Sequence, residues 1–248
     1  MEADVWLYNG TLYIGHEQAA LSTARTFDGL YIQPILRTLR TTNPNSSFVT
    51  SPTRNGVFDM SSGQTLYLWI DVKTDGPTTF PYAVRALQPL RDAGYLTKVL
   101  ANGTVVPGPV TVIGTGNTPL NQVQGIAPRD YFFDAPLPLL GSTFSNITSS
   151  VSPIASTDFA VQFGSVPDGR FNASQLALLA TQVSIANGKG VGVRYWDTPA
   201  FPISTRNRVW TTLYNAGVSL INVDDLVAGA GFADFGNFWE IGQQVVSP

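Results

Sequence analysis

The chain has 248 residues, of which 44% are hydrophobic and 11% aromatic, enough for a sizeable buried core. Charged residues make up only 12%, against about a quarter in typical soluble domains. The net charge is −3 and no basic run occurs, which argues against a nucleic-acid-binding protein. There is no cysteine, so disulfides and thiolate metal sites are excluded.

Sequence signals for cellular location point to the secretory pathway. No apolar run reaches the roughly 18 residues of a membrane-spanning helix, and no signal peptide is visible. Sequons of the Asn-x-Ser/Thr type are in modest excess, which predicts a secreted or lumenal glycoprotein whose signal segment lies outside this chain. The sequons begin at Asn9, Asn45, Asn102, Asn146 and Asn172.

Strand-like and helix-like patterns alternate along the chain, and no obvious linker interrupts them. In chain order the patterns predict strands at 2–7 and 11–16, a helix at 27–41, a strand at 65–73, a helix at 82–96, strands at 110–114 and 131–133, a strand followed by a helix within 154–163, a helix at 174–186, a strand at 190–196, a helix at 205–216 and a strand at 218–223. The segment 229–248 is rich in Gly and aromatic residues, and we expect it to pack over one end of the fold.

Strands that alternate with helices predict an α/β fold, with a parallel sheet covered by helices. The length favours one (β/α)8 barrel domain over residues 1–248. Seven of the predicted strands suit a barrel if 11–16 is a local hairpin extension. A closed barrel needs an eighth strand. We expect the missing strand to be the first one, so that the chain is an N-terminally truncated barrel.

Two predicted strands carry acidic residues on one face. Because successive side chains of a strand point to opposite faces, Glu2 and Asp4 share a face of the first strand, and Asp71 and Lys73 share a face of the strand at 65–73. Barrel active sites lie at the C-terminal strand ends, so three carboxylates should converge there. Such hard oxygen ligands suit Mg²⁺ or Ca²⁺. Lys73 would neutralise a phosphate oxygen, and His16, the only histidine, is a candidate general acid/base.

Each of these residues also has an ordinary structural interpretation. An Asp-x-Lys pair on a strand is often an ion pair and nothing more. A lone histidine in a hairpin is usually exposed or structural, and acidic residues at a chain start are usually solvated. The combination favours a site, because inward-facing acids on two strands of an apolar barrel need a partner.

Later strands offer weaker candidates for lining a substrate pocket. Arg194 and Trp196 share a face of the strand at 190–196, and Asn222 and Asp224 share a face of the last strand. Asp134 follows the short aromatic strand and would reach the same end. For Arg194 and Asp224, a buried ion pair is as good an interpretation as a place in the site.

The motifs resemble those of the phospholipase C-like phosphodiesterase superfamily, in its glycerophosphodiester phosphodiesterase and sphingomyelinase D branches. The shared pattern is Glu-x-Asp, a histidine about a dozen residues later, and acidic-x-Lys on the next strand. The chain is most similar to the fungal family called altered inheritance of mitochondria protein 6. That similarity is carried by EADVWLYNGTLYIGHE, TLYLWIDVKTDG, GPVTVIGTGNTPL, DYFFDAPL, GVGVRYWDTPAF and the final Asn-x-Asp-Asp-Leu strand.

This resemblance implies a (β/α)8 barrel that binds Mg²⁺ or Ca²⁺ through Glu2, Asp4 and Asp71. It places Lys73 on the phosphate, makes His16 one of two catalytic histidines, and sets Trp196 against the substrate. The family begins with a strand that carries the other histidine, and this chain has neither. The substrate would be a small phosphodiester or a lipid headgroup, which leaves room for peripheral contact with a membrane.

Three functions compete at this level. The first is a metal-dependent phosphoric diester hydrolase, inactive if the missing histidine is essential. The second is a secreted, non-catalytic barrel that binds a phosphorylated ligand through an acidic metal pocket. The third is a carbohydrate-active barrel, because paired carboxylates also serve glycoside hydrolysis, although a lysine beside Asp71 favours phosphate over sugar.

Overall fold

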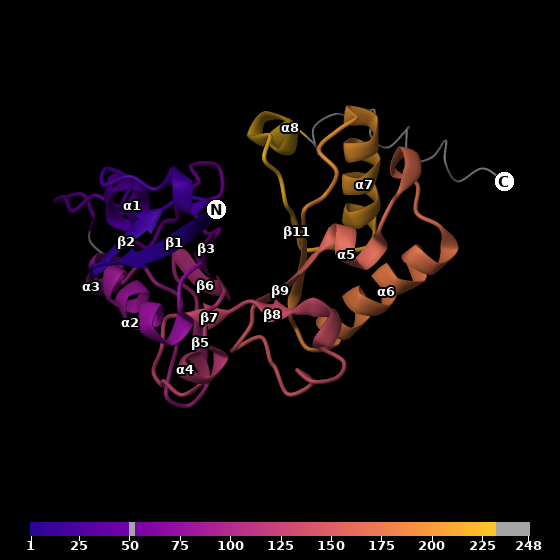
Figure 1. Ribbon diagram of the computed structural model, residues 1–248. Coiled ribbons are helices and arrows are strands. Elements are labelled where there is room, and N and C mark those ends of the chain that lie inside the picture. Colours follow the sequence, from indigo (N-terminus) through magenta and orange to yellow (C-terminus); the bar gives the residue numbers. More distant parts are fainter. Residues whose placement is uncertain (50–52, 232–248) are drawn as a thin grey trace. The chain divides into compact units, whose positions relative to one another are not determined.

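The computed structural model describes residues 1–49 and 53–231 and divides the chain into two compact units (Figure 1). Unit 1 comprises Met1–Asp134 and unit 2 comprises Ala135–Pro248. Of the segment 229–248, which we expected to pack over one end of the fold, the first three residues lie in helix α8 (Leu226–Gly231). The rest of that segment lies outside the described residues.

Unit 1 is built on a five-stranded sheet of order β2-β1-β3-β6-β7. All neighbours in it are parallel except the β1–β2 hairpin, whose turn residues Asn9 and Gly10 both have positive φ, as a tight hairpin turn requires. A two-stranded ribbon of β4 and β5 lies outside this sheet. The strands of unit 1 are β1 (Glu2–Tyr8), β2 (Thr11–Ile14), β3 (Leu66–Val72), β4 (Lys98–Val99), β5 (Val105–Val106), β6 (Val110–Gly116) and β7 (Phe132–Phe133).

Helices cover one face of this sheet. Apolar and polar side chains alternate along β3, and the apolar row faces the helices. Leu68, Ile70 and Val72 are at most 1% exposed and pack in one core with Leu39 and Phe80 of the helices. Asp71 lies on the opposite face of β3, so burying the apolar row leaves the acidic row free to form a site. The helices of unit 1 are η1 (Gln18–Ala20), η2 (Asp28–Ile32), α1 (Gln33–Thr42), α2 (Gly76–Ala86), α3 (Gln88–Asp92) and α4 (Leu120–Gln124).

Unit 2 contains a four-stranded parallel sheet of order β11-β10-β9-β8. Tyr195 of β10 is buried against Phe163, and its hydroxyl donates to Gln182 of α6. Its strands are β8 (Ala135–Pro136), β9 (Ile154–Asp158), β10 (Gly192–Trp196) and β11 (Leu220–Ile221). Its helices are η3 (Leu137–Leu139), α5 (Phe159–Phe163), η4 (Pro167–Gly169), α6 (Ala173–Gly188), α7 (Ile203–Asn215) and α8.

The α/β class and the parallel sheets that the sequence predicted are confirmed. A closed barrel is not found among the described residues, where the parallel strands form two sheets. The helix expected at 82–96 instead begins at Gly76 and is interrupted at Leu87. Within the described part of the chain, no helix has the length and apolar character needed to cross a membrane.

Candidate functional site

Glu2, Asp4 and Asp71 come together on unit 1. The parallel register of β1 and β3 places Asp4 directly beside Asp71, and Glu2 lies two residues earlier on the same face of β1. Each carboxylate offers one oxygen, and these three oxygens all lie within 4.8 Å of one another. The sequence therefore predicted this juxtaposition correctly. It follows from strand alternation and from pairing between β1 and β3.

Lys73 compensates part of this negative charge. Its Nζ lies 2.6 Å from Asp71 Oδ2 and 3.0 Å from Asp4 Oδ1. Burial alone would lower the pKa of Lys73, but the hydrogen bonds to Asp71 and Asp4 and the charges of these two carboxylates together raise it. The lysine therefore remains charged beside these two carboxylates.

Asp71 is the most constrained of the three acids. Burial raises the pKa of its carboxyl group, the hydrogen bond and charge of Lys73 lower it, and the charges of Asp4 and Glu2 raise it again. The net direction is upward, so the ionised form of Asp71 is held at a cost in the folded protein. A further cation at this cluster would relieve that cost.

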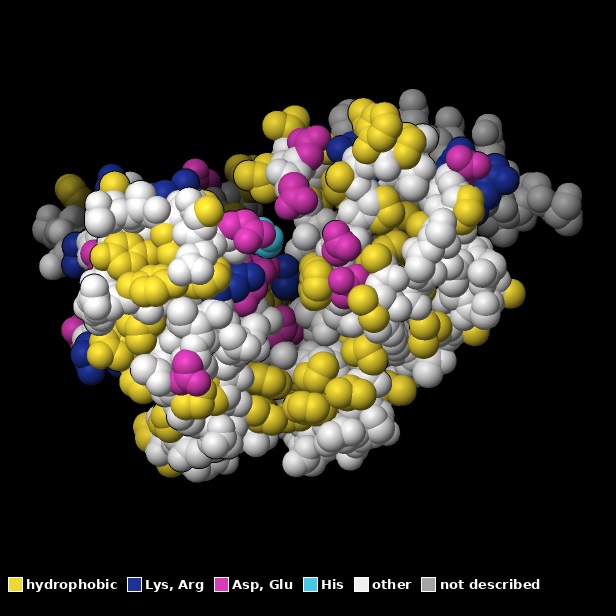
Figure 2. All heavy atoms as spheres, viewed as in Figure 1, with side chains coloured by type: hydrophobic (Ala, Val, Ile, Leu, Met, Phe, Trp, Pro, Cys, Tyr) yellow, Lys and Arg dark blue, Asp and Glu magenta, His cyan; other side chains and the backbone are white. Residues whose placement is uncertain are grey.

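His16 lies at the edge of the cluster. Its Nδ1 is 3.7 Å from Asp4 Oδ2, close enough for an ion pair when the imidazole is protonated but too long for a hydrogen bond. The His16 side chain is 80% exposed, so it is accessible to a ligand. Figure 2 shows the single histidine (cyan) next to acidic side chains (magenta) at the surface.

Two aromatic residues support the site in ways that the sequence analysis did not identify. Trp6 shares the face of Glu2 and Asp4, and its Nε1 donates to the carbonyl of Gly15, next to His16, at 2.7 Å. Tyr31, in the π-helical turn η2, donates its hydroxyl to the carbonyl of Glu2 at 2.7 Å. Burial, then the charges of Asp4 and Glu2, raise the pKa of Tyr31 and keep the phenol protonated.

Of the other predicted residues, Asp134 belongs to unit 1 and the rest belong to unit 2. Asp134 ends unit 1, where it is 9% exposed and its backbone N–H donates to Gly114. In unit 2, Arg194 donates from Nε and Nη2 to Oδ1 of Asn222, at 3.0 and 2.7 Å. Trp196, at the end of β10, is 42% exposed.

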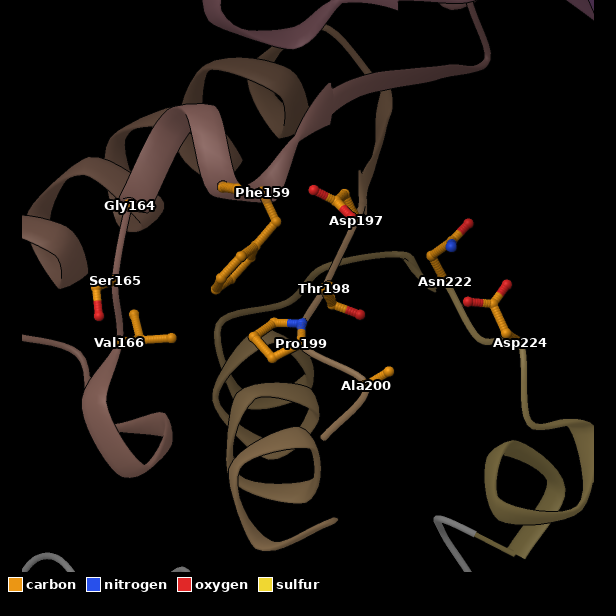
Figure 3. A pocket seen from close by; sticks show the side chains of 11 residues that line it. Phe159, Gly164, Ser165, Val166, Asp197, Thr198, Pro199, Ala200, Asn222 and Asp224 are labelled. Atoms are coloured by element: carbon orange, nitrogen blue, oxygen red, sulfur yellow. The ribbon is translucent and has the colours of Figure 1, made fainter. Parts of the chain in front are cut away.

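Asn222 and Asp224 line a cavity within unit 2, of about 470 Å³ (Figure 3). Its walls follow the carboxyl ends of β9, β10 and β11, where ligands commonly bind in open α/β sheets. Asp197, which has a positive φ of 56°, adds a second carboxylate to the lining, which also includes Phe159 (Figure 3). Asp197 was not predicted, although it directly follows the strand that carries Arg194 and Trp196.

Comparison with known proteins supports the phosphodiesterase resemblance. A protein-family profile described as the AIM6-like phosphodiesterase domain matches residues 1–134, the same bounds as unit 1. No solved structure matches the chain.

Curated fungal relatives match most of the chain. An altered inheritance of mitochondria protein 6 homolog of Arthroderma benhamiae is 54% identical over 235 residues, covering 94% of this chain and 74% of the relative. The proteins of the same name from Eremothecium gossypii and Lachancea thermotolerans are 34% and 32% identical, over 94% and 91% of this chain. The chain spans 63% and 58% of the length of those two relatives. The chain therefore belongs to the altered inheritance of mitochondria protein 6 family, a family of the phosphodiesterase type.

Proposed function

We propose that this protein is a metal-dependent phosphoric diester hydrolase that acts on a glycerophosphodiester or a phospholipid headgroup. The observation that carries the proposal is the convergence of Glu2, Asp4 and Asp71 beside Lys73 and His16 on one sheet face. The phosphodiesterase-type family supports the same reaction class.

The residues present fit a divalent cation. Three carboxylates with oxygens within 4.8 Å provide hard ligands of the kind that Mg²⁺ and Ca²⁺ prefer, and Lys73 Nζ lies 3.0 Å from Asp4 and 2.6 Å from Asp71. Burial first, and then the charges of Asp4 and Glu2, raise the pKa of Asp71, so a bound cation would stabilise its ionised form. When bound, Mg²⁺ or Ca²⁺ would supply Lewis-acid polarisation of a phosphoryl oxygen.

The protein side chains have distinct tasks in this proposal. Lys73, kept protonated by its carboxylate partners, presents a positive charge to a phosphate oxygen. His16 directs Nδ1 towards Asp4, which leaves Nε2 to exchange a proton with the attacking or leaving oxygen. The exposure of His16 allows a headgroup to approach it from solvent.

We also propose the finer architecture and location. Within each sheet the parallel strands neighbour one another in chain order, the arrangement of a (β/α)8 barrel of the phospholipase C-like phosphodiesterase kind. The sequons support passage through the secretory pathway. The cavity of unit 2 that Asn222, Asp224 and Asp197 line is suited to a polar ligand.

Turnover of a panel of glycerophosphodiesters and of phospholipid vesicles tests the function. We expect hydrolysis that a chelator abolishes and that added Mg²⁺ or Ca²⁺ restores. Asp71→Asn should lose metal affinity and activity together, and His16→Ala should lower kcat by about 10²- to 10⁴-fold while metal binding persists.

Asp28→Asn is the matched control, because Asp28 is an exposed acid of unit 1 whose side chain accepts a hydrogen bond from Gln33 and lies outside the carboxylate cluster. It should leave turnover unchanged. Metal-dependent binding of a phosphodiester without any turnover would replace the hydrolase with a binding protein. Hydrolysis that persists in chelator would remove the metal from the proposal.

A further inference from the structure

The turn after β6 lies directly against the carboxylate of Asp71. The register of β3 and β6 pairs Asp71 with Thr115 and Val72 with Gly116. Gly116 has a φ of +62°, and a Cβ built on it would overlap Asp71 Oδ1 and lie 2.8 Å from the carbonyl oxygen of Val72. Only a residue without a side chain therefore leaves the Asp71 carboxylate in its place.

The next residue, Asn117, ties the end of β3 to the same turn. Its backbone N–H donates to the carbonyl of Val72 at 2.9 Å. Its side-chain Nδ2 donates to the carbonyls of Lys73 and Thr74, at 3.3 and 3.1 Å. These three bonds fix the backbone that carries both Asp71 and Lys73.

A second glycine, Gly76, brings the loop after β3 close to the turn after β6. A Cβ on Gly76 would overlap the carbonyl of Asn117, so the loop after β3 and the turn after β6 fit together without spare room. This interlock matters because Asp71 is partly buried beside Asp4 and Glu2, whose like charges favour its rotation away from them. The space that Gly116 leaves open lets the carboxylate stay beside them.

We propose that Gly116 and Asn117 are positioning residues, which hold Asp71 and Lys73 in the orientation that brings them to Asp4. Neither residue contacts the substrate in this proposal. The part that concerns metal affinity rests on the function proposed above, whereas the steric part stands on the geometry of unit 1 alone.

Mg²⁺ and Ca²⁺ titrations of the full chain by calorimetry test the first part. Gly116→Ala should weaken binding by about 10- to 100-fold, the usual cost of disturbing a residue that orients a metal ligand. Gly94→Ala is the matched control, because Gly94 has a φ of +71° and a Cβ there would meet only Arg54 Nη2, at 3.8 Å. Both variants should unfold at lower denaturant concentration, but only Gly116→Ala should lose metal affinity.

Asn117→Ala provides a second route to the same answer if Gly116→Ala does not fold. It removes the two side-chain hydrogen bonds to the 73–74 backbone without adding any atom, and it should weaken metal binding in the same direction. Metal affinity unchanged in both Gly116→Ala and Asn117→Ala, or lowered equally in Gly94→Ala, would overturn the positioning role.

A double-mutant cycle on unfolding tests the steric part without any metal. In an Asp71→Ala background the carboxylate is gone, so Gly116→Ala should shift the unfolding midpoint by less than it does in the native chain. An equal shift in both backgrounds would show that Gly116 does not act through Asp71. If the native chain binds neither Mg²⁺ nor Ca²⁺, the metal-dependent hydrolase fails, and this cycle alone decides whether the turn positions Asp71.

Discussion

At the scale of single residues, His16 depends on its backbone neighbour for its position. Gly15 accepts a hydrogen bond from Trp6 Nε1 at 2.7 Å and donates its N–H to the carbonyl of Asp4 at 3.2 Å. The imidazole itself is mostly exposed and stands 3.7 Å from Asp4. The bonds to Gly15, more than any contact of the ring, therefore place His16 beside the carboxylates.

Trp6→Phe tests this dependence because it keeps an aromatic ring but removes the N–H donor together with part of the indole. We expect a loss of about 0.5–1.5 kcal/mol in the free energy of unfolding for the missing hydrogen bond. The chain has one histidine, so its imidazole proton resonance is assigned without ambiguity, and it should shift in Trp6→Phe.

Trp210→Phe makes the same chemical change in unit 2, where Nε1 reaches Thr198 at 3.4 Å, and should leave the His16 resonance in place. A His16 resonance that is identical in Trp6→Phe and the native chain would show that Trp6 does not hold the histidine.

The sequence predicted the acidic cluster but not the residues that orient it. Glu2, Asp4 and Asp71 could be found because alternation and parallel pairing fix which side chains face the same way. The contacts of Gly116 and Tyr31 depend on how a turn and a helix pack against the sheet. No local sequence pattern predicts this packing. The position of Trp6 near the site could have been predicted, because Trp6 follows Asp4 on the same face of the strand.

At the scale of elements, capping signals were better guides than apolar periodicity. The helix expected at 82–96 begins at Gly76, because Asp75 accepts a hydrogen bond from the N–H of Thr78 as its N-cap and a proline follows in the first turn. Val84 and Leu87 suggested one continuous stripe, but Leu87 interrupts the helix before α3. Reading the Asp-Gly-Pro signal would have placed the start correctly.

Helix α6 offers a test of a cap with a conservative control. Asn172 Oδ1 accepts from the N–H of Gln175 at 2.9 Å, and Gln175 Oε1 accepts from the N–H of Asn172 at 2.8 Å, which completes a capping box. Asn172→Ala should cost about 0.5–2 kcal/mol in the free energy of unfolding. Asn172→Asp retains the acceptor and should stay near the native value. Equal losses in denaturant unfolding of the two variants would contradict the capping role.

At the scale of the whole molecule, the sequence predicted the class of the fold but did not predict its division into two units. The alternation of strand and helix patterns predicts that successive parallel strands are neighbours, and within each sheet the parallel strands do neighbour one another in chain order. Closure of a barrel depends on pairing between strands far apart in the chain, which composition and periodicity do not encode. The bounds of unit 1 and of the matched family profile coincide at Asp134, so the carboxylate cluster lies entirely within the profile.

The sequons make a prediction about the whole surface. All five sequon asparagines are exposed, and only 12% of all residues are charged, so carbohydrate would supply much of the solubilising polarity of a secreted form. Protein made through the secretory pathway of a eukaryotic host should lose apparent mass on glycosidase treatment. Protein from the bacterial cytosol should not change. Replacing Asn9, Asn45, Asn102, Asn146 and Asn172 by Gln should abolish the mass loss, whereas an unchanged mass in the native chain, together with cytosolic fractionation in its own host, would exclude the secretory route.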